Sequence, residues 1–193
     1  MAVLHWYDFI CPFCYVGQAR TAILEEHRLT VVKMPFQTHP EIPPEGIAAG
    51  PRHAPMYSML EREARAAGIP LKWPSRLPNT RPALLATEWV RIHHPDSFAQ
   101  LYRDIFAAHF ALGEDIGDPE VIDRLVIEAG VDMTALDEAL ASGAAEEAVL
   151  EAESLGRGQG VSGTPAWLIS GNLITAFRPP SDFKRMARLA AEE

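Results

Sequence analysis

The sequence predicts an α/β fold in which a helical segment is inserted between two halves of a mixed sheet, and three observations support it. Near the N-terminus, a strand-like run, a helical pattern and a second strand-like run follow one another over residues 1–38. Residues 39–156 carry helical patterns almost throughout, after a proline-rich start. Residues 157–193 return to a strand–strand–helix order. We therefore expect one unit made of residues 1–38 and 157–193, and an inserted all-helical subdomain over residues 39–156.

The first strand and the first helix meet at the two cysteines of the chain. The run from Val3 to Ile10 is almost continuously apolar, as is typical of a central strand covered on both faces. Pro12 suits the first turn of a helix because its missing N–H would have no partner there, and apolar residues then recur at helical spacing. Cys11 and Cys14 are therefore expected at a strand-to-helix junction. Leu29 to Met34 reads as a second strand that closes a right-handed β-α-β unit.

The inserted segment is expected to hold five or six helices. It begins where Pro, Gly and small residues dominate residues 37–50 and exclude regular structure. The helices are expected at 56–67, from Asn79 or Thr80 to before Pro95, around the apolar stripe 98–106, from Asp118 onward, at 133–140 and at 144–155.

The C-terminal part predicts a β-hairpin and a last helix. Ala166–Ile169 and Leu173–Phe177 are strand-like and are joined through Ser-Gly-Asn. Ser181 is expected to cap the final helix, whose apolar residues share one face.

Composition and charge exclude several classes of protein. The chain has 193 residues, 48% of them hydrophobic, which is enough for one well-cored domain or for a domain with an insertion. Its formal net charge is -9, and no basic cluster interleaved with aromatics could follow a phosphate backbone, so no nucleic-acid partner is expected. No apolar run approaches the roughly 20 residues that span a bilayer, and no signal-peptide pattern is present. We therefore expect a soluble cytoplasmic protein that does not bind membranes.

The cysteine content points to redox chemistry. The chain has only 2 cysteines, too few for a disulfide framework or a four-thiolate metal site. A C-x-x-C pair near a β-then-α pattern is typical of a redox motif, although two buried structural cysteines remain an alternative. A metal site would have to recruit His93, His94 or His109. No second C-x-x-C or H-x-x-x-H accompanies the pair, so we expect no metal.

The position of the pair at a helix start also predicts different roles for its two thiols. A free cysteine with a pKa of about 8.5 is mostly protonated at neutral pH, and exchange needs the thiolate. The unpaired N–H groups and the positive dipole end at a helix N-terminus stabilise an anion. The thiolate of Cys11 should therefore be stabilised more than that of Cys14, which lies one turn further into the helix. Cys11 is expected to form a mixed disulfide with the substrate, and Cys14 to displace that substrate.

Two motifs resemble a known family. The motifs are Asp-Phe-Ile-Cys-Pro-Phe-Cys-Tyr at residues 8–15 and Gly-Val-Ser-Gly-Thr-Pro-Ala-Trp at residues 160–167. With the helical insertion between them, the chain resembles the DsbA-like thioredoxin superfamily, in particular its cytoplasmic FrnE-type branch. Relatives of that branch include 2-hydroxychromene-2-carboxylate isomerase and kappa-class glutathione transferase. The resemblance covers essentially the whole chain and implies a thioredoxin fold, with β-α-β and β-β-α halves around a mixed sheet.

The resemblance also implies roles for residues of the two motifs. Cys11 would be the nucleophilic thiol and Cys14 the resolving thiol, with Pro12 and Phe13 between them in the redox-active motif. Pro165 would be the cis-proline that faces the pair.

Three further residues are candidates for contacts with a substrate. Thr164 would offer its backbone to a substrate strand, as the resemblance implies. Phe13 and Trp167 lie beside the expected exposed sulfur in sequence, and they are candidates to line an apolar substrate groove.

Two neighbouring polar elements have open interpretations. Asp8 is a candidate to relay the proton of Cys11, or a strand-end residue that bonds backbone groups. The Asn79-Thr80 pair resembles an Asn-Thr element at the edge of the active site in relatives, but it also fits ordinary helix capping.

The leading functional hypothesis is a thiol–disulfide oxidoreductase that acts on disulfide-bearing proteins or low-molecular-weight thiols and needs no cofactor beyond Cys11 and Cys14. The alternative is a glutathione-dependent isomerase or transferase of the 2-hydroxychromene-2-carboxylate isomerase or kappa-class type. Relatives of that type commonly carry serine in place of Cys11, so the presence of both cysteines favours dithiol chemistry, with glutathione left open as a co-substrate. A redox-inert binding module that uses the groove above Pro165 is a third hypothesis. A homodimer is left open.

Overall fold

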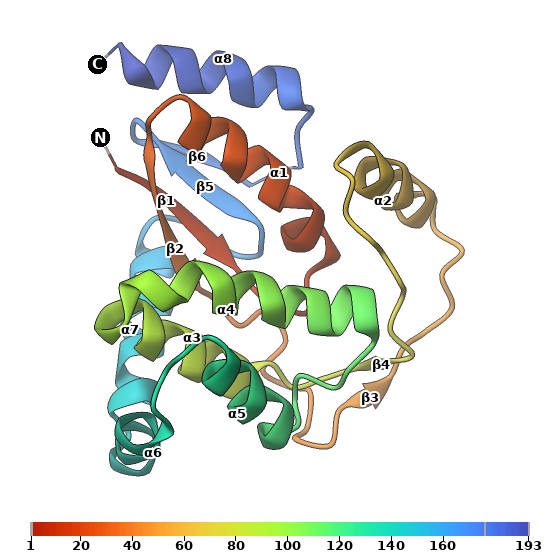
Figure 1. Ribbon diagram of the computed structural model, residues 1–193. Coiled ribbons are helices and arrows are strands. Elements are labelled where there is room, and N and C mark those ends of the chain that lie inside the picture. The colour runs from red at the N-terminus through yellow and green to blue at the C-terminus, as the bar shows by residue number, and fades with distance from the viewer. Residues whose placement is uncertain (1, 176, 193) are drawn as a thin grey trace.

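The computed structural model describes residues 2–175 and 177–192. Its main sheet contains β1 (Ala2–Tyr7), β2 (Thr30–Pro35), β5 (Ala166–Ile169) and β6 (Asn172–Ile174), in the order β2-β1-β5-β6 (Figure 1). β1 pairs with β2 in parallel and with β5 antiparallel, and β5 and β6 form an antiparallel hairpin. The sheet is therefore mixed, and the predicted α/β fold class is confirmed.

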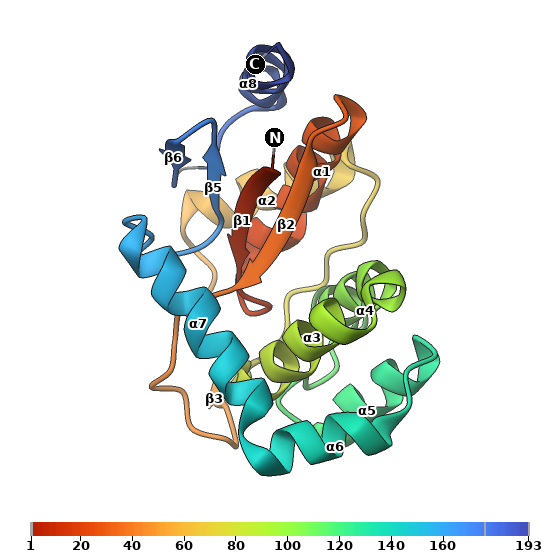
Figure 2. The same ribbon diagram turned by 90° about the vertical axis from the view of Figure 1, so that its left-hand side faces the viewer.

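Helices cover both faces of this sheet. α1 (Pro12–Glu26) and α8 (Pro180–Ala191) pack on one face, where Val3 of β1 and Trp167 of β5 meet Phe183 of α8. On the other face, Trp6 of β1 packs with Ala152 of α7 (Ala144–Gly158). Figure 2 shows α7 on the side of the sheet away from α1. Because side chains alternate along a strand, Val3 and Trp6 of β1 serve different cores.

The inserted segment supplies five other α-helices among the residues that the structure describes. They are α2 (Pro55–Ala66), α3 (Arg81–His93), α4 (Pro95–Ala107), α5 (Pro119–Glu128) and α6 (Met133–Ser142). A single π-helical turn at Ala108–Leu112 extends α4 and ends at Gly113, which has the left-handed backbone that glycine accepts without strain. The predicted N-cap at Asp118 is confirmed, since its side chain accepts from the backbone N–H of Glu120.

The helical segment shares a core with the sheet. Tyr7, Phe9 and Cys14 are buried in the same cluster as Leu84 of α3 and Phe106 of α4. α7 runs to Gly158, so the expected boundary before residue 157 falls inside a helix, and the division into two units stays a prediction. Among the helices of the described residues, none is long and apolar enough to cross a membrane.

Some element boundaries differ from the predicted ones. The first strand ends at Tyr7 and not at Ile10, because residues 8–10 turn away from the sheet and the N–H of Cys11 bonds the carbonyl of Asp8 at 3.1 Å. β6 ends at Ile174; residue 176 of the predicted strand lies outside the described residues. The last helix has Pro179 as its N-cap, so the prediction of Ser181 as the cap is wrong.

A second, two-stranded sheet was not predicted. It pairs β3 (Ile47–Ala48) with β4 (Arg76–Leu77). Two-residue strands leave too little alternation to be recognised in a sequence. Their pairing holds together the two loops on either side of α2, next to the cavity described below.

Candidate active site

The N-terminus of α1 presents Cys11 to a cavity. Cys11 is the N-cap residue of α1, and no side-chain cap occupies the first turn. Its carbonyl accepts from the N–H of Cys14 at 3.0 Å and from that of Tyr15 at 3.2 Å. Pro12 stands at the first helical position, as predicted from its missing N–H.

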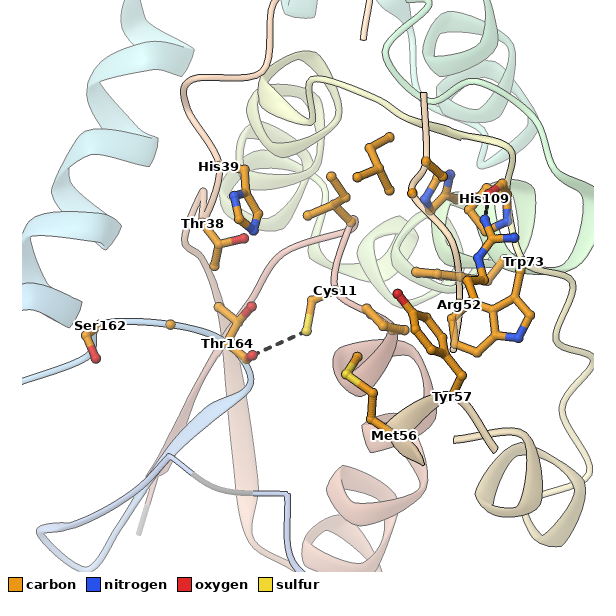
Figure 3. Close-up of a pocket in the computed structure, with 18 residues that line it drawn as sticks. Cys11, Thr38, His39, Arg52, Met56, Tyr57, Trp73, His109, Ser162 and Thr164 are labelled. Atoms are coloured by element: carbon orange, nitrogen blue, oxygen red, sulfur yellow. Dashed lines mark hydrogen bonds between the residues drawn. The ribbon is translucent and has the colours of Figure 1, made fainter. Parts of the chain in front are cut away.

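The two thiols differ in their surroundings. Cys11 is partly exposed, whereas Cys14 is fully buried, and both are free thiols. The Cys11 Sγ lies 3.2 Å from the carbonyl oxygen of Thr164 and donates to it (Figure 3). Only Cys11 is therefore open to an incoming disulfide.

These surroundings move the two pKa values in opposite directions. Burial acts to raise the pKa of Cys11, but the thiol of Cys14, the side chain of Thr164 and the N–H of Cys14 outweigh it, so the pKa is lowered. Burial raises the pKa of Cys14 well above its ordinary value, and the neighbouring Cys11 adds to that rise. Cys11 is the thiol that ionises first, as a nucleophile must.

Asp8 is a buried carboxylate behind the pair. One oxygen accepts from both the N–H and the hydroxyl of Thr38 at 2.7 Å, and the other accepts from the N–H of Ile10 at 3.4 Å. Burial raises its pKa, and the hydrogen bonds from Thr38 partly offset that rise. Asp8 thus bonds backbone groups, as one of the two interpretations expects, and connects the loop after β2 to the turn before Cys11. The proton relay stays a prediction.

A cavity of about 470 Å³ opens beside Cys11. Its near wall is formed by Ile10–Pro12 and Ser162–Thr164, and its far wall by the first turn of α2, by the loops on either side of α2 and by the π-helical turn. Figure 3 shows Cys11 and Thr164 across the cavity from Arg52, Trp73 and His109. The volume lies in the range of small-molecule sites.

The predicted site residues are only partly brought together. Pro12 and Thr164 line the cavity with Cys11. Pro165 is buried behind them, and the Thr164–Pro165 peptide bond is cis. Phe13 faces Phe177, with ring centroids 5.6 Å apart, and does not line the cavity.

The prediction that Trp167 lines the substrate groove is wrong. Its side chain is fully buried, stacks on His5 at 4.8 Å and meets Phe183 of α8. Strand alternation explains this, because Ala166 faces α7 and the next residue must point to the opposite face, under α1 and α8. Trp167 therefore packs under α1, close to Gly17, and has no exposed surface with which to contact a substrate.

Sequence reasoning missed the far wall of the cavity. Arg52 and Trp73 come from proline-flanked loops before and after α2, and Tyr57 comes from the first turn of α2. His109 comes from the π-helical turn and was considered only as a metal ligand. The available signal was an arginine and a tryptophan inside Gly- and Pro-rich loops, which often carry binding residues. Asn79 does not line the cavity; it accepts from the N–H of Arg81 at the start of α3.

A family model covers nearly the whole chain. Residues 2–188 match the family described as DSBA-like thioredoxin domain. The chain belongs to this family. The resemblance to DsbA-like proteins is thereby confirmed.

Three solved structures share the fold of this DSBA-like chain. A probable DsbA oxidoreductase from Streptomyces coelicolor is 23% identical, with a TM-score of 0.84 over 100% of this chain and 91% of that chain. The cytosolic disulfide reductase DsbM from Pseudomonas aeruginosa, solved with GSH, is 18% identical, with a TM-score of 0.75 over 100% of both chains. A 2-hydroxychromene-2-carboxylate isomerase is 20% identical, with a TM-score of 0.74 over 100% of this chain and 98% of that chain.

Proposed function

We propose that this protein is a thiol–disulfide oxidoreductase in which Cys11 is the nucleophile and Cys14 the resolving thiol. The observation that carries the proposal is the asymmetry of the pair. Cys11 is partly exposed at a cavity and has a lowered pKa, and Cys14 is buried with a raised pKa. A dithiol with one accessible thiolate and one protected thiol is arranged for two successive exchanges.

The first exchange joins the protein to its substrate. The Cys11 thiolate attacks one sulfur of a substrate disulfide, a bond forms between the two sulfurs, and the substrate S–S bond breaks. The departing thiolate takes up the proton that Cys11 lost. The N-terminus of α1 and the side chain of Thr164 stabilise the attacking thiolate.

The second exchange releases the substrate. Cys14 loses its proton and attacks Cys11, which forms a Cys11–Cys14 disulfide and expels the second substrate thiolate, which takes up that proton. The substrate has gained two electrons and the protein dithiol has lost them. The same steps run in reverse when the protein oxidises a dithiol. A low-molecular-weight thiol such as glutathione would regenerate the dithiol in the reducing direction.

The substrates proposed are disulfide-bearing proteins or low-molecular-weight disulfides. Membership of the FrnE-type branch and a cytoplasmic location belong to the same proposal, and the likeness to a protein described as a cytosolic disulfide reductase supports the location. Light scattering would test whether the protein is a homodimer.

Insulin reduction with dithiothreitol as the electron source tests the proposal. Wild type should accelerate the reaction, and Cys11→Ser should reduce the rate to that of the uncatalysed reaction. Thr30→Val serves as a folding and handling control. Thr30 is exposed and pairs with Ala2, at the end of β1 opposite to the one that leads to Cys11. Equal activity of Cys11→Ser and wild type would contradict the dithiol mechanism.

The cavity favours a second candidate, a glutathione-dependent isomerase or transferase. A space of about 470 Å³ beside the Cys11 position could hold a glutathione molecule and a small co-substrate. Glutathione binding and isomerase activity that persist in the Cys11→Ser, Cys14→Ser double variant would favour this candidate. Loss of glutathione binding and of isomerase activity in that variant would favour the oxidoreductase.

A further inference from the structure

The cavity beside Cys11 differs in charge from the rest of the molecule. The chain has 26 acidic and 17 basic residues. Eighteen residues of the described chain line the cavity, and none of these is Asp or Glu, whereas Arg52, His39 and His109 are among them. In a protein with a net charge of -9, a cavity without carboxylates and with a guanidinium group selects anions over cations.

Arg52 is a cation without a carboxylate partner. Among the described residues, Arg52 forms no ion pair, although other side chains there form ten. The guanidinium donates to the carbonyl of Pro74 and lies 5.7 Å from the ring of Trp73. These two contacts hold the planar group at the cavity wall and leave other N–H donors free. An unpaired, positioned guanidinium is the group that proteins use to bind carboxylates.

His109 is an independent sign of a ligand at the same end. Its side chain is only 1% exposed, and neither ring nitrogen has a hydrogen-bond partner among the described residues. Burial lowers its pKa to about 4, opposed by the nearby backbone of Glu114 and by the charge of Asp115. The neutral ring carries one N–H, and no described group, the Glu114 backbone included, lies in hydrogen-bond geometry with either ring nitrogen. A buried donor without a partner is costly unless a ligand satisfies it.

Between Cys11 and the end of the cavity that holds Arg52 and His109, the wall is formed mainly by aromatic and apolar side chains. Met56, Tyr57 and Phe110 line the cavity, and Tyr57 meets Trp73 edge to face with ring centroids 4.9 Å apart. A ligand that fits must present a sulfur to Cys11, an apolar stem to these walls and an acceptor to the far end (Figure 3).

We propose that Arg52 and His109 form a subsite for a carboxylate, and that the small substrates of this enzyme are low-molecular-weight disulfides bearing a carboxylate group. This inference rests on the proposed function, because the disulfide must react with Cys11. Cys11 forms a mixed disulfide with one half of the substrate and Cys14 then displaces it, so that each carboxylate stays on the thiol product that carried it. Arg52 is then a residue that determines specificity.

Two disulfides separate the subsite from the redox chemistry. Dithiodipropionate carries carboxylates, and bis(hydroxyethyl) disulfide is a neutral compound of similar size. The ratio of their kcat/KM values should favour dithiodipropionate in wild type. Arg52→Gln should lower that ratio about ten-fold, because one charge-assisted hydrogen bond is lost. Arg62→Gln changes the net charge equally at an exposed residue that does not line the cavity, and should leave the ratio unchanged.

The outcomes are distinguishable. If wild type reduces neither of these disulfides and also fails to accelerate insulin reduction, the proposed function is wrong. If it accelerates insulin reduction but reduces neither small disulfide, the proposed function stands and the carboxylate-bearing small substrates are wrong. If it reduces both but Arg52→Gln and Arg62→Gln shift the ratio equally, or neither shifts it, the carboxylate subsite is wrong.

A non-reacting ligand gives a second readout. Thiodipropionate has a thioether in place of the disulfide, so its binding to the reduced protein can be measured by calorimetry without exchange. Its Kd should rise about ten-fold in Arg52→Gln, and should rise in His109→Phe, with Arg62→Gln equal to wild type. Equal affinity in wild type and both cavity variants would overturn the proposal, whatever the variants do to turnover.

Discussion

Thr164 offers two different groups to the reactive sulfur of Cys11. Its carbonyl oxygen accepts from the thiol at 3.2 Å. Its hydroxyl is buried with no hydrogen-bond partner in the described part of the chain, and its side chain favours the ionised form of Cys11. The thiol is therefore bonded to the carbonyl, and the hydroxyl is available to donate to the sulfur once its proton leaves.

Thr164→Val tests whether the hydroxyl donates to the thiolate, since valine keeps the shape of threonine and removes the donor. The pKa of Cys11 should rise, which the thiolate absorbance near 240 nm, followed against pH, would measure. The matched control Thr30→Val makes the same change at an exposed residue of β2. If Thr164→Val left the titration of Cys11 in place, the hydroxyl would not be a thiolate donor.

Among the elements, α7 packs on the sheet more closely than any side chain would allow. A Cβ added at Gly156 would lie 2.7 Å from Trp6 Nε1 and 3.1 Å from Phe36. Trp6 also donates from Nε1 to the carbonyl of Ala152, one turn before. The glycine lets the helix approach the strand at this point.

Gly156→Ala should therefore destabilise the protein by about 1–3 kcal/mol, because the added methyl group overpacks the contact. Gly158→Ala lies in the same helix with no atom within 4 Å of the added Cβ, and should be neutral or stabilising by less than about 1 kcal/mol. Guanidinium unfolding of the two variants measures the difference. Equal stabilities would contradict the close packing.

Arg20 connects α1 to the wall of the cavity. It is buried on α1, pairs with Glu63 of α2 at 2.5 Å, donates to the carbonyl of Arg178 at 3.2 Å and covers the ring of Phe177 at 4.4 Å. α2 also carries Met56 and Tyr57. This buried cation thus links α2 to α1, the helix whose start carries Cys11 and Cys14.

Arg20→Met should loosen α2, because methionine keeps most of the buried volume and loses the ion pair. Hydrogen exchange should become faster across residues 55–66. Arg124→Met, which removes a surface pair with Glu114, should leave exchange in that segment unchanged. Exchange of α2 that is the same in Arg20→Met and wild type would show that other contacts hold the helix.

Across the whole molecule, two buried histidines link stability to pH. Burial lowers the pKa of His5 to about 3, and that of His109 to about 4. Neither ring has a hydrogen-bond partner among the described residues. In the unfolded chain histidine takes up a proton near pH 6.5, while the buried rings stay neutral. The unfolded state therefore binds more protons between about pH 6.5 and 4, and stability falls as the pH falls through that window.

His5→Phe should flatten this dependence, since phenylalanine keeps a ring stacked on Trp167 and takes up no proton. The slope of unfolding free energy against pH should decrease by up to about 1.4 kcal/mol per pH unit. The raised pKa of Asp8 acts with the opposite sign, but it is present in both proteins and cancels in the difference. His53→Phe at an exposed position is the control. Equal slopes for wild type and His5→Phe would contradict the account.

Most of the fold could be predicted from local patterns in the sequence. Continuous apolar runs marked β1 and β2, Pro12 marked the start of α1, and Asp118 marked the start of α5. These features depend on neighbours within a few residues, so a linear reading finds them.

The remainder depends on contacts between distant segments. Trp167 follows Pro165 closely in sequence, but its burial depends on α8, which covers that face of the sheet. The far wall of the cavity joins Arg52 to His109, and no local pattern relates the two residues. The position of Cys11 and Cys14 at the start of α1 could therefore be predicted, and the far wall of the cavity, which is proposed to select the substrate, could not.

Trapping the mixed disulfide tests most sharply whether Cys11 attacks and Cys14 resolves. Reduced Cys14→Ser protein is mixed with dithiodipropionate and then digested and mapped by mass spectrometry. The account predicts a stable adduct on Cys11, and much slower modification of Cys14 in the Cys11→Ser protein. Modification of Cys14 in Cys11→Ser as fast as that of Cys11 in Cys14→Ser would contradict it.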